Sequence, residues 1–126
     1  MSAANLDIVV EQGSTFQRQL YFNDNDIPTP APIDISGWTF AAQIRRSYSD
    51  PTIQATFTPS FVTDGTDGLL LITLTALETA AIVVKAAKDY TRPVTKYIWD
   101  IEATFPDLSV ARILQGEADI SPEVTR

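Results

Sequence analysis

The chain has 126 residues, of which 44% are hydrophobic and 20% charged, and these values are ordinary for one globular domain. It contains no cysteine and no histidine, which excludes disulfides and thiolate chemistry and removes the commonest metal ligand and general base. The net charge of −7 argues against binding to nucleic acid or to an anionic membrane surface.

No stretch approaches the roughly 18 apolar residues of a membrane span. Residues 1–5 lack the basic and apolar regions of a signal peptide. We therefore expect a protein made in the cytoplasm, without a membrane or nucleic-acid partner and without a cofactor.

Two strands are predicted near the N-terminus, over residues 6–10 and 15–22. The linker between them is short, so they are either a hairpin or one strand that bends across to a second sheet. Arg18 falls on the apolar face of the second strand, where its stem can cover apolar surface while the guanidinium reaches an edge. The other residues of that face are Phe16, Leu20 and Phe22.

Residues 23–37 form the longest irregular segment, with prolines at Pro28, Pro30 and Pro32. Alternating prolines favour extended geometry and exclude a central strand. This segment is predicted to be a surface loop that joins two sheets.

Three further strands are predicted in the middle of the chain, over residues 38–46, 52–58 and 69–74. The last is apolar on both faces, as expected of a central, well-covered strand. Two Asp-Gly steps in residues 63–68 predict a turn before it. On the first two strands the inward residues are predicted to be Trp38, Phe40, Ala42, Ile44, Ile53, Ala55 and Phe57.

One short helix is predicted near residues 76–87. Thr75 and Glu78 have the spacing of a capping box. Lys85 and Lys88 lie where cations complement the helix dipole. The apolar stripe at helical spacing consists of Leu77, Ala80, Ala81 and Val84.

The clearest signal is a β-hairpin over residues 97–104 and 110–120, with a loop of about five residues. The alternation of apolar and polar residues indicates a sheet that packs against the core on one face and is exposed to solvent on the other. The inward residues are predicted to be Tyr97, Trp99, Ile101 and Ala103 on the first strand and Leu114, Gly116, Ala118 and Ile120 on the second. Seven or eight short strands and one helix indicate a sandwich or a small barrel. We favour a mainly β, two-sheet antiparallel sandwich that forms a single domain over residues 1–126.

Asp100 and Glu102 are two residues apart on one strand face, an arrangement that a glycosidase could use. The alternation favours a solvated outer face instead. Glu117 and Asp119 receive the same interpretation. Calcium could bind at residues 23–26 or 64–67, but Asn and Asp are also the ordinary residues of turns, which is the favoured interpretation.

Arg45, Arg46 and Tyr48 could grip an acidic or sugar partner, because arginine and aromatic residues are favoured at interfaces. The alternative is that they lie in solvent at a strand end. Trp38 and Trp99 fall on inward faces, which favours core packing over a carbohydrate platform.

The order of several segments carries a resemblance: residues 7–16 (DIVVEQGSTF), 35–45 (ISGWTFAAQIR), 74–80 (LTALETA), 97–102 (YIWDIE), 112–116 (RILQG) and 121–126 (SPEVTR). In this order the chain resembles small virion proteins of tailed bacteriophages and prophages, and the immunoglobulin-like N-terminal domain of upper baseplate proteins. The resemblance covers nearly the whole chain and implies an immunoglobulin-like sandwich without active-site residues. It also implies a role in attaching fibres, receptor-binding proteins or decorating parts to a tail, baseplate or neck. In this chain the attachment module would stand alone, without the fibre-like or coiled region of a full upper baseplate protein.

These observations favour a non-enzymatic structural or adaptor protein of a phage particle, located in the virion in multiple symmetric copies that contact other virion proteins. The predicted contact residues are Arg45, Arg46, Tyr48, Pro28, Pro30, Asp100 and Glu102. The alternative is a carbohydrate-binding module for host-surface recognition, with a shallow groove lined by Tyr21, Tyr48, Tyr90 or Trp99. A third hypothesis, an acid/base hydrolase, needs two converging carboxylates, against which the alternation argues.

Overall fold

A computed structural model describes residues 4–23, 31–82 and 95–122. They form nine strands and one helix. In chain order these are β1 (Ala4–Asn5), β2 (Ile8–Glu11), β3 (Phe16–Tyr21), β4 (Thr39–Arg45), β5 (Ala55–Thr56), β6 (Thr58–Phe61), β7 (Leu69–Leu74), α1 (Ala76–Ala80), β8 (Thr95–Thr104) and β9 (Val110–Ser121).

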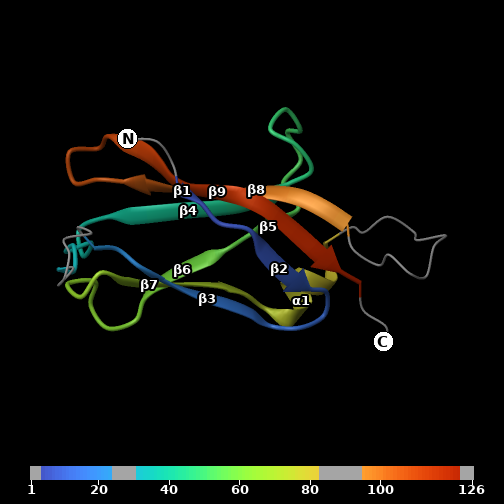
Figure 1. Cartoon of the computed structure of the whole chain (residues 1–126), viewed down its shortest axis with the longest axis horizontal. Coiled ribbons are helices and arrows are strands. Elements are labelled where there is room, and N and C mark those ends of the chain that lie inside the picture. Colours follow the sequence, from blue (N-terminus) through green and yellow to red (C-terminus); the bar gives the residue numbers. More distant parts are fainter. Residues whose placement is uncertain (1–3, 24–30, 83–94, 123–126) are drawn as a thin grey trace.

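The strands form two sheets that pack face to face (Figure 1). The larger has six strands in the order β1-β9-β8-β4-β5, with β2 also paired to β9, and the smaller has three in the order β3-β7-β6. The neighbours β9-β8-β4 and β3-β7-β6 correspond to strands G-F-C and B-E-D of immunoglobulin-like domains. The predicted mainly β sandwich with one short helix is therefore confirmed.

The N-terminal segment departs from the predicted antiparallel pairing, because β1 and β2 both pair with β9 in parallel. After β2 the chain crosses to the smaller sheet, where β3 pairs with β7. The linker between β2 and β3 thus joins two sheets rather than closing a hairpin. Because no tight turn connects β2 to β9, the two strands are free to pair in parallel.

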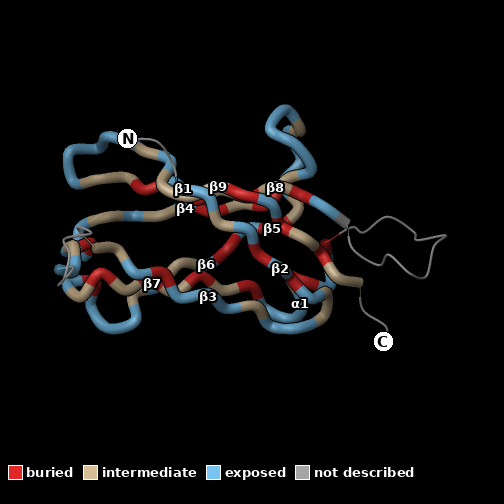
Figure 2. Tube along the Cα trace, in the orientation of Figure 1, coloured by how far each residue is buried: buried red, intermediate tan, exposed pale blue. Residues whose placement is uncertain are grey.

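The core lies between the sheets, and both sheets contribute buried residues to it (Figure 2). Trp99 on β8 is 1% exposed and is the largest fully buried side chain. Its ring lies 5.8 Å from that of Phe57, which in turn lies 5.8 Å from Phe16 on the opposite sheet. All the predicted inward residues of β8 are buried, which confirms the face assignment of the hairpin.

The predicted strand over residues 52–58 is divided between the two sheets. β5 pairs with β4 in the larger sheet, whereas β6 pairs with β7 in the smaller one. Phe57 lies at the crossing, with its N–H donated to the Ala42 carbonyl at 2.9 Å and its ring buried. Ile53, predicted to point inward, is 44% exposed because it precedes β5 in a loop. Trp38 is only partly buried, among Phe22, Phe40 and Phe105 at one end of the sandwich.

Helix α1 begins as predicted, with both hydrogen bonds of the Thr75–Glu78 capping box present. It ends at Ala80, earlier than expected. The last turn tightens, because the Ile82 N–H bonds to Thr79 O, and Ile82 then turns into the core. The predicted continuation with Val84, Lys85 and Lys88 lies outside the described residues. No helix among those described is long and apolar enough to cross a bilayer.

Candidate functional site

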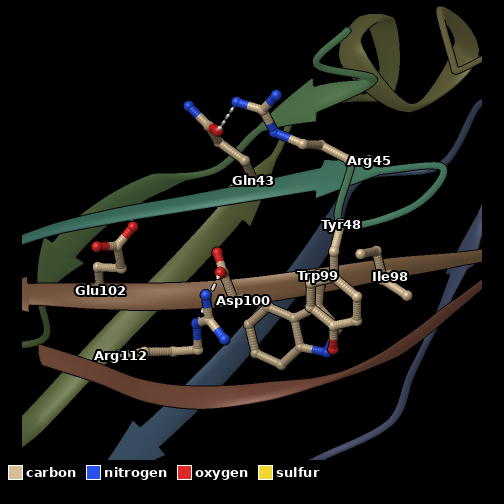
Figure 3. A pocket seen from close by; sticks show the side chains of 8 residues that line it. All are labelled: Gln43, Arg45, Tyr48, Ile98, Trp99, Asp100, Glu102 and Arg112. Carbon is tan, nitrogen blue, oxygen red and sulfur yellow. Dashed lines mark hydrogen bonds and ion pairs between the residues drawn. The ribbon is translucent and has the colours of Figure 1, made fainter. Parts of the chain in front are cut away.

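A polar hollow lies on the outer face of the larger sheet, over β4 and β8 and beside β9 (Figure 3). Its volume is about 140 Å³. The lining residues come from these three strands and from the loop between β4 and β5, and they are Gln43, Arg45, Tyr48, Ile98, Trp99, Asp100, Glu102 and Arg112.

Strand alternation explains which β4 and β8 side chains face the hollow. On β4 the outward positions include Gln43 and Arg45, since Ile44 between them is fully buried. Gln43 pairs with Asp100 and Arg45 pairs with Ile98 in the register of the sheet. Trp99 lines the hollow although its indole points into the core, where Nε1 donates to the Leu6 carbonyl at 2.8 Å.

A β-bulge places Arg112 at the hollow. The register pairs Ile101 with Leu114 but Glu102 with Arg112, so β9 carries one extra residue, Ile113. Regular alternation from the inward Leu114 would turn Arg112 toward the core. The bulge reverses this and brings the guanidinium to the outer face beside Glu102.

Arg112 is the most connected side chain of the hollow. Its Nε lies 3.1 Å from Asp100 Oδ2, and the two point toward one another in Figure 3. Nη1 donates to Gln115 Oε1 at 3.2 Å, and the guanidinium carbon lies 5.9 Å from the centre of the Tyr48 ring. These contacts hold the guanidinium in one orientation.

Arg45 fixes the loop that carries Tyr48. Its Nη2 donates to Gln43 Oε1 at 3.0 Å, and its Nη1 donates to the backbone carbonyl of Asp50, also at 3.0 Å. The loop is closed further by the Asp50 carboxylate, which accepts the Thr52 N–H at 2.9 Å. Tyr48 stands on this loop with its side chain largely in solvent.

The structure brings together four residues of the predicted contact set: Arg45, Tyr48, Asp100 and Glu102. Arg46 is exposed next to them but does not line the hollow. Pro28 and Pro30 lie outside the described residues, as does Tyr90. Tyr21 is exposed on β3 in the other sheet, so it takes no part in the hollow.

Sequence reasoning missed Gln43, Gln115 and Arg112. For Arg112 the sequence held one signal: a charged residue at a position that regular alternation would turn inward, which indicates a β-bulge. The two carboxylates predicted to share a face do so, but they are not equivalent. Asp100 is paired with Arg112, whereas Glu102 has no hydrogen-bond partner in the described part of the chain.

Of the aspartates considered for calcium, Asp64 and Asp67 hydrogen-bond within a turn, whereas Asp24 and Asp26 lie outside the described residues. The Asp64 carboxylate accepts the N–H and hydroxyl of Thr66, and these hydrogen bonds lower its pKa. Asp67 accepts the hydroxyl of Thr63 and the N–H of Leu69. Within residues 4–23, 31–82 and 95–122, no three acidic side chains gather as a metal site.

The fold and the hollow define a β-sandwich with a small polar site on one sheet face. No family model and no curated protein matches the sequence. Among solved structures, a mutant of the SrpA adhesin from Streptococcus sanguinis is similar, with a TM-score of 0.47 and 12% sequence identity. The match covers 92% of this chain and 55% of that chain, so this protein spans about half its length.

Proposed function

We propose that this β-sandwich is a non-enzymatic adaptor of a tailed-phage particle, which attaches other virion proteins to a tail, baseplate or neck. The observation that carries the proposal is the gathering of Arg45, Tyr48 and Arg112 on one exposed sheet face. Arginine and tyrosine are enriched where interfaces concentrate their binding energy. The location in a phage particle is supported by the order of sequence segments, which resembles that of small virion proteins of tailed phages.

The adaptor is proposed to act in several symmetric copies in the virion, because particle parts repeat with the symmetry of the particle. Protein partners would meet the outer face of the larger sheet. The smaller sheet offers a different surface, to which β3 contributes the exposed residues Gln17, Gln19 and Tyr21.

Mass spectrometry of purified virions tests the location, and we expect the protein to be present. Arg45→Glu combined with Tyr48→Ala should reduce its incorporation roughly tenfold, the effect of losing about 1.4 kcal/mol of contact energy. Gln19→Glu combined with Tyr21→Ala, two exposed positions of the opposite sheet, is the matched control and should leave incorporation unchanged. Absence of the protein from virions would overturn the proposal.

A second candidate, a carbohydrate-binding module for host-surface recognition, is favoured by one observation. Tyr48 is 65% exposed at the edge of a hollow lined with hydrogen-bonding side chains. An exposed aromatic ring beside polar groups suits a ligand that has both an apolar face and hydroxyls. Binding of the whole protein to a glycan array tests this candidate independently of virion assembly.

A further inference from the structure

We propose that the hollow binds one neutral pyranose unit of a glycan, with its hydroxyls between Glu102 and the two arginines and its C–H face on Tyr48. This inference rests on the second candidate function and assigns it a site and a ligand class.

The balance of charge in the hollow favours a neutral ligand. Two guanidinium groups, Arg45 and Arg112, face two carboxylates, Asp100 and Glu102. The four formal charges sum to zero, so the hollow has no net attraction for a ligand ion of either sign. A hydroxyl group is both donor and acceptor, so it can use both kinds of side chain without a cost in charge repulsion.

The hydrogen-bonding capacity of these side chains is only partly used. A guanidinium has five N–H donors. Arg45 donates to Gln43 and Asp50, whereas Arg112 contacts Asp100 and Gln115, and each retains further N–H groups. Glu102 is an acceptor with no hydrogen-bond partner in the part of the chain that the structure describes. Spare donors and a spare acceptor therefore face the same hollow.

Tyr48 supplies the apolar contact. The Arg112 guanidinium lies 5.9 Å from the centre of its ring and engages one side of the aromatic system. Tyr48 is nevertheless 65% exposed, and Ile98 adds an apolar group to the lining. The negative face of an aromatic ring attracts the weakly positive C–H groups of a sugar.

The site is organised before any ligand arrives. Both arginines are held by side-chain or backbone acceptors, and the strands that carry them are hydrogen-bonded to β8. Preorganisation reduces the entropy lost on binding. The hollow of about 140 Å³ is small and open, which limits the contact to one sugar unit. We therefore expect weak binding, with a Kd on the order of 1 mM.

The test is an NMR titration of the ¹⁵N-labelled full chain with the methyl glycosides of glucose, galactose, mannose and N-acetylglucosamine, and with galacturonate as the anionic comparison. At least one of them should produce saturable shifts confined to the amides of residues 43–48, 98–102 and 112–115. Tyr48→Ala should weaken that binding roughly tenfold, as expected for loss of a central aromatic contact. Glu102→Gln should weaken it as well, while Tyr21→Ala on the other sheet, the matched control, should not.

Three results would overturn the site. The first is the absence of saturable shifts with every neutral glycoside in a folded protein. The second is binding that Tyr48→Ala leaves intact, and the third is saturable binding of galacturonate alone. Glycan-array binding that survives Tyr48→Ala would reject this site but retain the second candidate. Detection in virions without any sugar binding would reject this inference and leave the adaptor function standing.

Discussion

Trp99 is the residue on which the two sheets and the N-terminal strand converge. Its ring contacts Phe57 within the core, and its Nε1 bonds to the Leu6 carbonyl. We expect Trp99→Ala to lower the free energy of unfolding by about 3–5 kcal/mol, because a large cavity remains. Urea denaturation followed by circular dichroism measures this. Tyr48→Ala, at an exposed aromatic, should cost under about 1 kcal/mol; equal losses at both positions would contradict the core assignment.

The pKa of Asp107 depends on hydrogen bonds from Ser109. Its carboxylate accepts the hydroxyl and the N–H of Ser109, at 2.6 and 3.0 Å, and these bonds hold its pKa below the ordinary value of 3.8. Because the folded pKa is the lower one, this contribution to stability is complete above the unfolded pKa and is lost as pH falls through the folded pKa. Carboxyl NMR titration should show the pKa of Asp107 rising in Ser109→Ala. Ser60→Ala on β6 should leave it unchanged.

At the scale of elements, the attachment of the N-terminal strands depends on Gly116. A Cβ at this position would collide with the Leu6 carbonyl and approach Asp7, whose Oδ1 accepts the Glu117 N–H at 2.9 Å. Gly116→Ala should therefore destabilise the protein by about 1–3 kcal/mol and increase hydrogen exchange in β1 and β2. Gly37→Ala, where the added Cβ would meet only Cγ of Pro106 at 3.2 Å, should cost less stability and leave hydrogen exchange in β1 and β2 unchanged.

Helix α1 is hydrogen-bonded to the β2–β3 turn through the buried side chain of Thr79. Its hydroxyl donates to the Ser14 carbonyl at 2.9 Å and accepts the Gly13 N–H at 3.0 Å. Thr79→Val keeps the shape but leaves both backbone groups unpaired, so we expect a loss of about 1–3 kcal/mol in unfolding free energy. Thr56→Val on the exposed side of β5 is the control. A loss at Thr79 no larger than at Thr56 would show that the turn does not depend on this hydroxyl.

The sequence predicted those elements whose strands pair with a neighbour in the chain, and it missed features that depend on distant residues. The β8–β9 hairpin followed from alternation and a short loop, and the faces of Trp99 and Ile101 were correct. The crossing at Phe57 was missed, because it depends on a distant carbonyl, Ala42 O. The bulge that turns Arg112 outward depends on the register of two strands, so the hollow was predicted only in part.

At the scale of the whole molecule, the two sheets share one hydrophobic core. Residues such as Leu20 and Ile72 from the smaller sheet and Ile44 and Ile101 from the larger belong to one buried cluster. Neither sheet can bury its apolar face without the other, so the loss of one exposes the other. The protein should thus behave as one cooperative unit.

We therefore expect urea to unfold the chain in a single transition, with an m-value of about 1–3 kcal/mol/M. Tryptophan fluorescence reports the core through Trp99 and one end of the sandwich through Trp38, while far-ultraviolet circular dichroism reports the strands of both sheets. The two curves should coincide. Refolding should be slow, in milliseconds to seconds, because the strands of β-sandwiches pair over long separations in sequence, as β2 and β9 do here. Separate midpoints for the two signals would mean that the sheets unfold independently and that the shared core is not the source of their stability.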